Sequence, residues 1–129
     1  MGGALATHAA VQIMTAGISV AQFYTFGSPR VGDEKFSLWF DSFLKTNNKF
    51  RITHGRDPVP HLPPADFGFT HVPHEIFYHG TVKEGFVTCN DSGIKEDSGC
   101  SDKYKADVMV TDHLTYFDID YTVTVLTCQ

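Results

Sequence analysis

Apolar residues in the first third of the chain follow two different patterns. From residue 2 to residue 15, small and apolar residues recur at helical spacing, which predicts a helix packed closely against a sheet rather than a surface helix. Residues 20–26 then form a continuous apolar and aromatic run, the pattern of a strand buried on both faces of a parallel sheet. The spaced positions of the helix are Ala4, Leu5, Ala9 and Ile13.

A second helix and a second strand follow a turn at residues 27–32. Asp33 is well placed to cap this helix, which we expect to end near Lys45. The next strand, residues 50–53, comes directly afterwards, so the elements run helix, strand, helix, strand. This order implies right-handed parallel crossovers and an α/β fold. The expected apolar face of the second helix consists of Phe36, Phe40, Phe43 and Leu44.

The pattern is weaker beyond residue 64. We expect a strand at residues 75–82, a candidate partner strand at 86–89 and a loop without periodicity at 90–102. Residues 112–117 indicate a turn or a single helical turn. Apolar and polar positions alternate over residues 118–126, which is the period of a strand, and the apolar positions are Ile119, Tyr121, Val123 and Val125.

Composition limits the classes of function. A chain of 129 residues that is 42% hydrophobic and 13% aromatic is long enough for one domain with a core of its own. The formal net charge of −5 and the lack of clustered Lys and Arg argue against binding to nucleic acid or to an anionic membrane. No apolar run approaches the length of about 20 residues that spans a bilayer. Residues 1–13 lack the cationic start of a signal peptide, so we expect none in this chain.

The chain contains three cysteines, an odd number that leaves one without a partner. Cys89 and Cys100 flank a polar loop, which suits a local disulfide, whereas Cys128 has no evident partner near the end of the chain. Three reduced thiols in a cytosolic protein are the alternative, because two cysteines on one loop do not establish a bond.

The stretch Arg51–Pro64 contains the most informative polar residue. Strand 50–53 leads into a loop in which Asp57 is followed by four prolines, and prolines stiffen a loop by fixing φ. An acid on a stiff loop after a strand is how many α/β enzymes present a catalytic carboxylate. The alternative is that Asp57 only starts a turn, as Asp before Pro commonly does.

His113 supplies a second group in the order that an α/β-hydrolase requires. In that fold the nucleophilic serine, the acid and the histidine follow one another along the chain, and Asp57 precedes His113. The His113 imidazole can take a serine proton through one nitrogen while the other nitrogen donates to Asp57. Without Asp57, His113 is explained equally well as a surface histidine at the start of a helix.

Two other classes of function fit parts of the chain. Four histidines within residues 61–79 suggest a metal site, but Pro73 interrupts helical spacing and no Cys-x-x-Cys accompanies them, so we assign no metal. A binding protein without catalytic activity is the other alternative, because no serine lies in a Gly-x-Ser-x-Gly context. The histidines are His61, His71, His74 and His79, and the serines considered as nucleophiles are Ser19, Ser28, Ser37 and Ser42.

Several segments match the motifs of one protein family. The chain begins Met-Gly-Gly-Ala-Leu-Ala, and glycines that open a small-residue helix allow the close helix–strand approach of a nucleophile elbow. Residues 24–32 read Tyr-Thr-Phe-Gly-Ser-Pro-Arg-Val-Gly, 56–64 read Arg-Asp-Pro-Val-Pro-His-Leu-Pro-Pro, and 112–117 read Asp-His-Leu-Thr-Tyr-Phe. With the loop between Cys89 and Cys100, these segments resemble the fungal-type (class 3) lipases, whose elbow reads Gly-His-Ser-Leu-Gly-Gly-Ala-Leu-Ala. The resemblance covers nearly the whole chain.

The resemblance implies roles for individual residues. It places the catalytic acid at Asp57 and the general base at His113. It also implies a groove for an acyl chain, which is held by area and shape alone, so apolar and stiff residues suit its lining. For Val59 and Val110 the alternative is ordinary core packing. The implied groove positions are Val59, Leu62, Pro63, Phe67, Val110 and Leu114.

The start of the chain departs from the family pattern. Met1 takes the place of the leucine that follows the nucleophile, so the serine would lie one residue before Met1. The main-chain amide of Met1 would then be the oxyanion donor, a role that a free amino terminus fills poorly. In the family the last cysteine, here Cys128, pairs with one near the missing amino-terminal part. Asp33 is the alternative acid because it also follows a strand, although capping a helix is the simpler role.

We therefore expect the carboxy-terminal half of an α/β-hydrolase, with residues 1–129 forming a truncated part of one mostly parallel domain. The resemblance implies a secreted serine ester hydrolase of triacylglycerol-lipase type that acts without a cofactor on a lipid or other ester at an interface. Without the serine we expect this chain to be inactive, and we expect Cys128 to lack its partner. The 20–26 strand should expose an unpaired apolar edge, where the strand that carries the serine would have paired.

Overall fold

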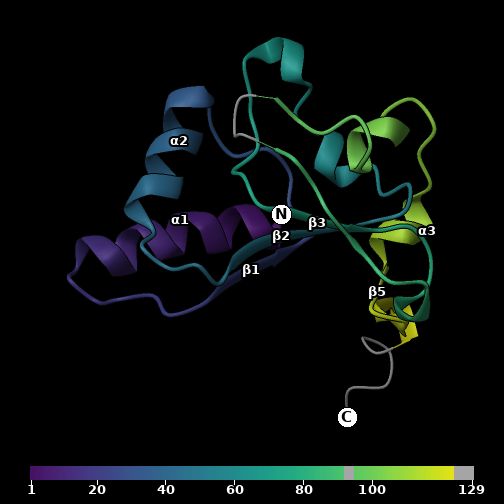
Figure 1. Ribbon diagram of the computed structural model, residues 1–129, viewed down its shortest axis with the longest axis horizontal. Coiled ribbons are helices and arrows are strands. Elements are labelled where there is room, and N and C mark those ends of the chain that lie inside the picture. The colour runs from purple at the N-terminus through teal and green to yellow at the C-terminus, as the bar shows by residue number, and fades with distance from the viewer. Residues whose placement is uncertain (92–94, 124–129) are drawn as a thin grey trace.

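The computed structural model describes residues 1–91 and 95–123 of the chain (Figure 1). The Asp33 carboxylate accepts a 2.8 Å hydrogen bond from the Phe36 N–H and so caps the second helix, as predicted. The predicted order helix, strand, helix, strand is confirmed. These elements are helix α1 (Gly2–Thr15), strand β1 (Phe23–Phe26), helix α2 (Glu34–Phe43) and strand β2 (Lys49–His54).

Strands β1 to β4 form one mostly parallel sheet. Strand β3 (Glu75–Tyr78) lies parallel to β2, and β4 (Val87–Thr88) pairs with β3 in the antiparallel direction. The sheet order is β1-β2-β3-β4, and Phe26, Ile52 and Ile76 are register partners across the three parallel strands. The predicted mostly parallel α/β arrangement is therefore present, although β3 and β4 are shorter than the sequence indicated.

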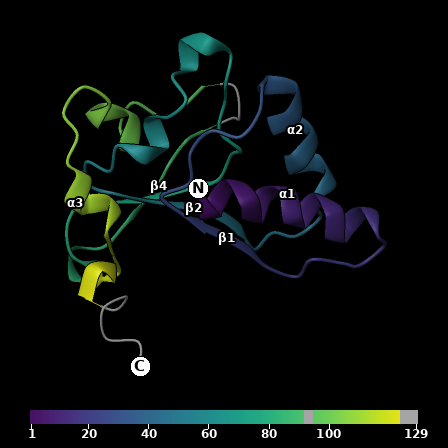
Figure 2. The ribbon, with the colours of Figure 1, turned by 180° about the vertical axis from the view of Figure 1, so that it is seen from behind.

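The region after β4 folds into short elements. Helix α3 (Val110–His113) is a helical turn that overlaps only the start of the one predicted at residues 112–117, because β5 (Thr115–Tyr116) occupies part of that range. Strand β5 pairs with β6 (Ile119–Asp120) in a hairpin. Figures 1 and 2 both place α3 and this hairpin at the end of the molecule away from α2. Short 3-10 helices occur at Val59–His61, Ala65–Phe67, Val82–Glu84 and Ser101–Tyr104.

The strand predicted at residues 118–126 is wrong for the residues that the structure describes. Only Ile119 and Asp120 belong to β6, and the chain becomes helical at residues 121–123. The Asp120 carboxylate accepts the Thr122 N–H at 2.8 Å, so a local side-chain hydrogen bond replaces the strand ladder that the alternation suggested. Residues 124–129, and with them Cys128, lie outside the described residues.

Helix α1 packs through its small residues and not through the apolar face that the spacing predicted. Ala10 is buried, whereas Leu5 and Ile13 are 64% and 42% exposed. A Cβ atom on Gly3 would lie 2.6 Å from the Cβ atom of Ser28, so this approach of α1 to the turn after β1 requires a glycine. The predicted close packing is confirmed, but close approach, and not side-chain hydrophobicity, determines which face is buried.

Strand β1 is buried on one face only, which corrects the prediction of burial on both. Phe23 and Thr25 are buried, while Tyr24 and Phe26 are 43% and 44% exposed. Phe23 packs with residues of α1 and α2, and the opposite face of the sheet packs against the hairpin through Tyr116. In Figure 1, α2 lies above the sheet and the hairpin lies below it. As predicted, β1 is an edge strand.

A buried ion pair lies on the same face of the sheet as Phe23. Arg51 and Glu75 are register partners in β2 and β3, each is 1% exposed, and their charged groups are 2.9 Å apart. Burial raises the pKa of Glu75, but the Arg51 charge and the hydrogen bonds from Ser101 and Thr53 outweigh burial, so this pKa is lowered overall. A charged network therefore occupies part of the core.

The predicted local disulfide joins Cys89 and Cys100, which are 11 positions apart. Cys100 is fully buried and packs with Phe77 of β3 and with Tyr104. The bond thus connects the loop after β4 to the sheet.

Candidate active site

Asp57 lies in the loop that leaves the carboxyl end of β2. Gly55, at φ +48°, turns the chain after the strand, and the Asp57 N–H donates to the His54 carbonyl at 3.1 Å. The Asp57 Oδ1 atom accepts the Val59 N–H at 2.8 Å, a local contact that fixes the carboxylate on its own loop. Asp57 therefore does take part in a turn, and its other carboxylate oxygen bonds to residues distant in the sequence.

His113 is the last residue of α3, and its imidazole meets the Asp57 carboxylate. The His113 Nδ1 atom is 2.9 Å from Oδ2 of Asp57, although the two residues are 56 positions apart. The Asp57 side chain is 1% exposed and the His113 side chain is 31% exposed. Because a carboxylate only accepts, Nδ1 carries the proton and the Nε2 atom of the neutral ring is left as an acceptor. The structure thus brings together the two residues predicted as acid and base.

Tyr116 is a third member of this cluster, for which the sequence suggested no role. Its hydroxyl donates to Oδ2 of Asp57 at 2.7 Å, and the residue is buried in β5. Burial first, and then the Asp57 charge and the hydrogen bond to it, raise the pKa of Tyr116, so the hydroxyl stays protonated. Val59, His113 and Tyr116 give the carboxylate three donors, as a buried charge requires. The motif at residues 112–117 contained Tyr116 but gave no sign of its partner.

Gly27 forms one wall of the cluster, where the chain leaves β1. At φ +52° it adopts the left-handed conformation that favours glycine. A Cβ atom at this position would lie 2.6 Å from Asp57 Oδ2, 2.8 Å from the Tyr116 hydroxyl and 3.0 Å from His113 Nδ1. Both the conformation and the space at this position therefore require glycine.

Comparison with known proteins identifies the family of this arrangement. The family model described as Lipase (class 3) matches residues 1–67, which is more than half of the 129-residue chain and includes Gly27 and Asp57. The chain belongs to the class 3 lipase family. His113 and Tyr116 lie beyond residues 1–67, which the lipase family model matches. Their assignment to the site rests on their contacts with Asp57.

Two relatives show how much of a class 3 lipase the chain represents. Secreted mono- and diacylglycerol lipase 1 of Fusarium solani is 35% identical over 121 residues, which cover 91% of this chain and 35% of that protein. The lipase of Rhizomucor miehei is 38% identical over 125 residues, which cover 93% of this chain and 33% of that protein. The chain thus spans about a third of the length of these relatives.

Solved lipase structures share the fold. Lipase II from Rhizopus niveus is 31% identical and superposes with a TM-score of 0.79, covering 92% of this chain and 44% of that one. A triacylglycerol lipase whose catalytic centre is a serine protease triad is 35% identical, also with a TM-score of 0.79, and covers 92% of this chain and 45% of that one. The fold is therefore part of the α/β-hydrolase fold, as predicted.

In this class 3 lipase chain, two hydrogen bonds of the Arg56 main chain fix the helical turn of His113 to the Asp57 loop. The Arg56 N–H donates to Asp112 Oδ2 at 2.7 Å, and the Met109 N–H donates to the Arg56 carbonyl at 2.7 Å. Arg56 directly precedes Asp57, and Asp112 directly precedes His113. Asp57 and His113 thus each directly follow a residue that takes part in the hydrogen bond between their two segments.

Arg30 braces the proline-rich part of the same loop. Its buried guanidinium donates through Nη1 to the carbonyls of His61 and Pro63 at 2.7 and 2.8 Å. The Nε and Nη2 atoms bond to the Glu96 carboxylate at 2.6 and 2.7 Å. The sequence motif around Arg30 was recognised, but its role was missed because its partners come from two other segments.

The predicted groove residues differ in exposure. Val59 and Pro63 are half-buried, and the other four positions are exposed. Leu62 lines a cavity of about 480 Å³ beside the loop, but charged residues such as Asp102 and Lys105 line it as well. The role of these residues in holding an acyl chain stays a prediction.

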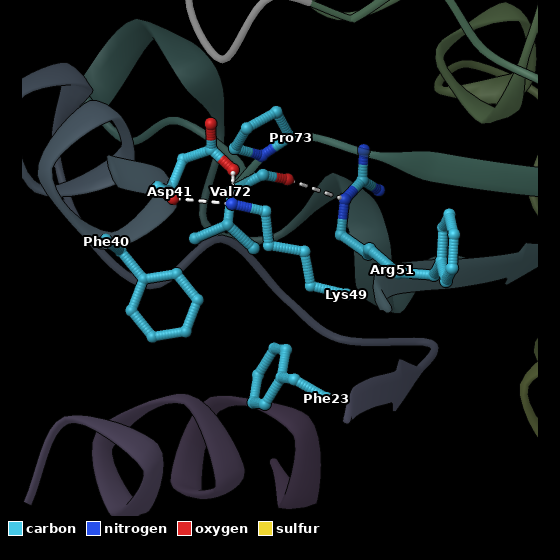
Figure 3. A pocket seen from close by; sticks show the side chains of 8 residues that line it. Phe23, Phe40, Asp41, Lys49, Arg51, Val72 and Pro73 are labelled. Carbon is cyan, nitrogen blue, oxygen red and sulfur yellow. Dashed lines mark hydrogen bonds and ion pairs between the residues drawn. The ribbon is translucent and has the colours of Figure 1, made fainter. Parts of the chain in front are cut away.

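A separate small pocket lies between α2 and the amino-terminal ends of β1 and β2 (Figure 3). Phe23 contributes to its apolar side, and Lys49 pairs with Asp41 in it at 2.6 Å. The Arg51 Nε atom donates to the Val72 carbonyl at 3.3 Å beside it. The pocket holds about 10 Å³, close to the minimum for one water molecule, so it is too small for an acyl chain.

The serines considered as nucleophiles are exposed or donate to main-chain carbonyls. Ser19 is exposed. Met1 is 84% exposed at the start of α1, and its carbonyl accepts the Leu5 N–H at 3.2 Å. Its role as an oxyanion donor stays a prediction. The hydroxyls of Ser28, Ser37 and Ser42 donate to the main-chain carbonyls of Pro29, His71 and Trp39.

The histidines considered as metal ligands contact different partners. The Nε2 atom of His71 donates to the Pro60 carbonyl at 2.6 Å, and that of His74 lies 2.8 Å from a carboxylate oxygen of Asp41. The Nδ1 atom of His79 lies 3.1 Å from the hydroxyl of Tyr104. Each of these three rings is thus engaged in a separate contact.

Proposed function

We propose that this chain contributes the acid and the general base of a serine ester hydrolase of triacylglycerol-lipase type. The observation that carries the proposal is the 2.9 Å contact between Nδ1 of the partly exposed His113 and the buried Asp57 carboxylate. Asp57 precedes His113 in the order that the α/β-hydrolase fold requires. A solved relative with a serine protease triad is a triacylglycerol lipase, which supports this reaction class.

In the proposed reaction, His113 Nε2 takes the proton of a serine hydroxyl as the serine oxygen attacks the ester carbonyl. The Asp57 carboxylate, held by its three donors, stabilises the imidazolium that forms. His113 then gives the proton to the leaving alcohol, and the serine keeps the acyl group. Water activated by the same imidazole releases the acid and restores the serine. The Met1 main-chain N–H is the proposed oxyanion donor, because the family resemblance puts Met1 directly after the serine.

A lipid ester is the proposed substrate class, and an extracellular location is part of the proposal. Exposed apolar residues on the loop of the acid and on the helix of the base, such as Leu62 and Val110, suit contact with an acyl chain. The Fusarium solani relative is secreted by its name, and a disulfide is typical of secreted proteins. No helix within residues 1–91 and 95–123 is long and apolar enough to cross a membrane. The proposed reaction needs no cofactor.

We also propose that the chain is the carboxy-terminal part of a single α/β-hydrolase domain. The relatives are longer, and the sheet of four strands ends in the edge strand β1. The rest of the domain would supply the serine and a neighbour for β1.

The test joins Met1 to the amino-terminal part of a class 3 lipase that ends in Gly-His-Ser, and measures the hydrolysis of a p-nitrophenyl ester. We expect the fusion to be active, and we expect His113→Ala and Asp57→Asn each to lower kcat by about 10³-fold or more. His8→Ala, which changes an exposed histidine of α1, is the matched control and should leave kcat unchanged. Full activity of the His113→Ala fusion would contradict the proposal.

The chain alone provides a second test. We expect no covalent adduct after treatment with a fluorophosphonate, because no serine of the chain lies in the context of a nucleophile. An adduct on any serine of the chain would show that the nucleophile is internal. The alternative function, a binding protein without catalysis, predicts a folded fusion that binds the ester and does not hydrolyse it.

A further inference from the structure

His54, the last residue of β2, bonds to the main chain beside the proposed general base. It is 8% exposed, and its Nδ1 atom is 3.1 Å from the carbonyl oxygen of Asp112. Because a carbonyl only accepts, Nδ1 is the donor in this contact. Asp112 directly precedes His113, so the bond restrains the main chain from which the His113 imidazole extends.

The His54 ring also packs against residues that surround the acid. It stacks on Tyr78 with ring centroids 4.5 Å apart and an angle of 11° between the planes. It meets Tyr116 edge to face at 5.7 Å and 72°. Tyr116 is the residue whose hydroxyl donates to Asp57 Oδ2. The His54 ring therefore contacts both the α3 turn that carries His113 and Tyr116, the donor to Asp57.

We propose that His54 is a positioning residue for the Asp57–His113 pair, an inference that rests on the proposed function. The role lies in the Nδ1–H, which fixes the α3 turn through the Asp112 carbonyl, while the ring packs beside Tyr116. A phenylalanine would keep the stacking and lose the donor, which is why the position uses histidine. The arrangement matters because a displacement of about 1 Å in a catalytic group costs about 10²-fold in rate.

The test follows the His113 Nδ1 proton by NMR in the chain itself, at a concentration at which it is monomeric. His54→Phe keeps a ring and removes the donor, whereas His54→Asn keeps a side-chain N–H. We expect the proton to exchange with water about tenfold faster in His54→Phe, and to stay within about threefold of the parent in His54→Asn. His79→Phe is the matched control, because His79 also stacks on a tyrosine, but it is exposed and its Nδ1 atom contacts the Tyr104 hydroxyl.

In the active fusion, His54→Phe should lower kcat about tenfold with KM unchanged, and His54→Asn should restore most of it. The inference would be overturned if His54→Phe had the exchange rate and the kcat of the parent. It would also be overturned if His54→Asn showed the fast exchange and the low kcat expected of His54→Phe. Should His54→Phe not fold, His54→Asn decides: parent-like exchange supports the inference and faster exchange overturns it.

Asp57→Asn separates this inference from the proposed function. It should abolish the protected His113 proton. If the proton is unaffected by Asp57→Asn, the acid–base pair fails and both proposals fall with it. If only His54→Phe has no effect, the pair stands and the positioning role of His54 is wrong.

Discussion

Tyr116 and His113 donate to the same carboxylate oxygen, Oδ2 of Asp57, at 2.7 and 2.9 Å. The phenol comes from β5 and the imidazole from α3, so the hairpin and the helical turn meet on one atom of the β2 loop. The other oxygen, Oδ1, is held by the main chain of Val59. The carboxylate thus has little freedom to rotate.

Removing the phenol should loosen this carboxylate. Tyr116→Phe deletes one donor to a buried charge, so we expect the free energy of unfolding to fall by about 1–3 kcal/mol. Denaturant titration measures the loss, and Tyr104→Phe is the matched control because the Tyr104 hydroxyl bonds an exposed histidine. An equal loss of unfolding free energy in both variants would show that the hydrogen bond to Asp57 stabilises the fold no more than the exposed bond of Tyr104 does.

The buried pair of Arg51 and Glu75 should make stability depend on acid. The folded-state pKa of Glu75 is below its ordinary value of 4.5, so its contribution is complete above pH 4.5 and is lost as pH falls through the lower folded pKa. Glu75→Gln should cost about 3 kcal/mol at pH 7 and remove this part of the acid dependence.

Denaturant midpoints between pH 3 and pH 7 check the Glu75 prediction. Burial raises the pKa of Asp91, which has the opposite effect on pH dependence, so the difference between the parent and Glu75→Gln is the informative quantity. Glu84→Gln changes an exposed carboxylate and serves as the control. A constant difference from pH 3 to pH 7 would contradict the prediction.

His71 should contribute a second pH dependence, at higher pH. Burial, and then the charges of Arg51 and Arg30, hold the pKa of His71 well below its ordinary value of 6.5. The unfolded chain therefore binds a proton below pH 6.5 that the folded chain does not, and stability falls as pH drops below 6.5.

His71→Gln is the variant for this second dependence. It keeps a side-chain N–H near the Pro60 carbonyl, and it should flatten the pH profile below 6.5 by up to about 1.4 kcal/mol per pH unit. Thermal or denaturant unfolding between pH 5 and pH 8 measures the slopes, which should coincide above pH 7. Burial also lowers the pKa of His61, but this effect is common to both proteins. Parallel profiles over the whole range would argue against a neutral buried His71.

The free edge of β1 should cause association of the isolated chain. Tyr24 and Phe26 are exposed on this edge strand, and an apolar edge is a template for pairing with another chain. We expect poor solubility and a mass that rises with concentration in sedimentation experiments. Tyr24→Lys should reduce association, whereas Leu38→Lys, on the exposed side of α2, should not. A monomeric parent that unfolds cooperatively would refute the expectation.

Local patterns predicted most elements of the first half of the fold. The cap at Asp33 and the run before Phe26 depend on near neighbours in sequence, so α2 was placed close to its observed bounds and β1 ends at Phe26 as predicted. Strand β1 begins at Phe23, however, and not at residue 20 as predicted. The buried face of α1 was mispredicted because Gly3, and not Leu5, makes the close contact with the neighbouring turn. The alternation after Asp118 was misleading because the Asp120 side chain ends the strand after two residues.

The candidate site was predictable only in part. Asp57 and His113 carry motifs of their own, and the structure places them in contact. The partners Tyr116, Arg30 and His54 act through contacts with distant segments, and no local spacing encodes such contacts. The motifs therefore identified the acid and the base and missed the groups that hold them.

The glycine that follows β1 determines what the site can accommodate. Three polar atoms, from Asp57, Tyr116 and His113, converge on the position that a methyl group at Gly27 would occupy. One boundary of the site is therefore bare main chain, and substitution at Gly27 can only add bulk to it. Strand β1 contributes no polar side chain to the cluster, yet any family member that keeps these three groups in this geometry has a strong reason to keep glycine here.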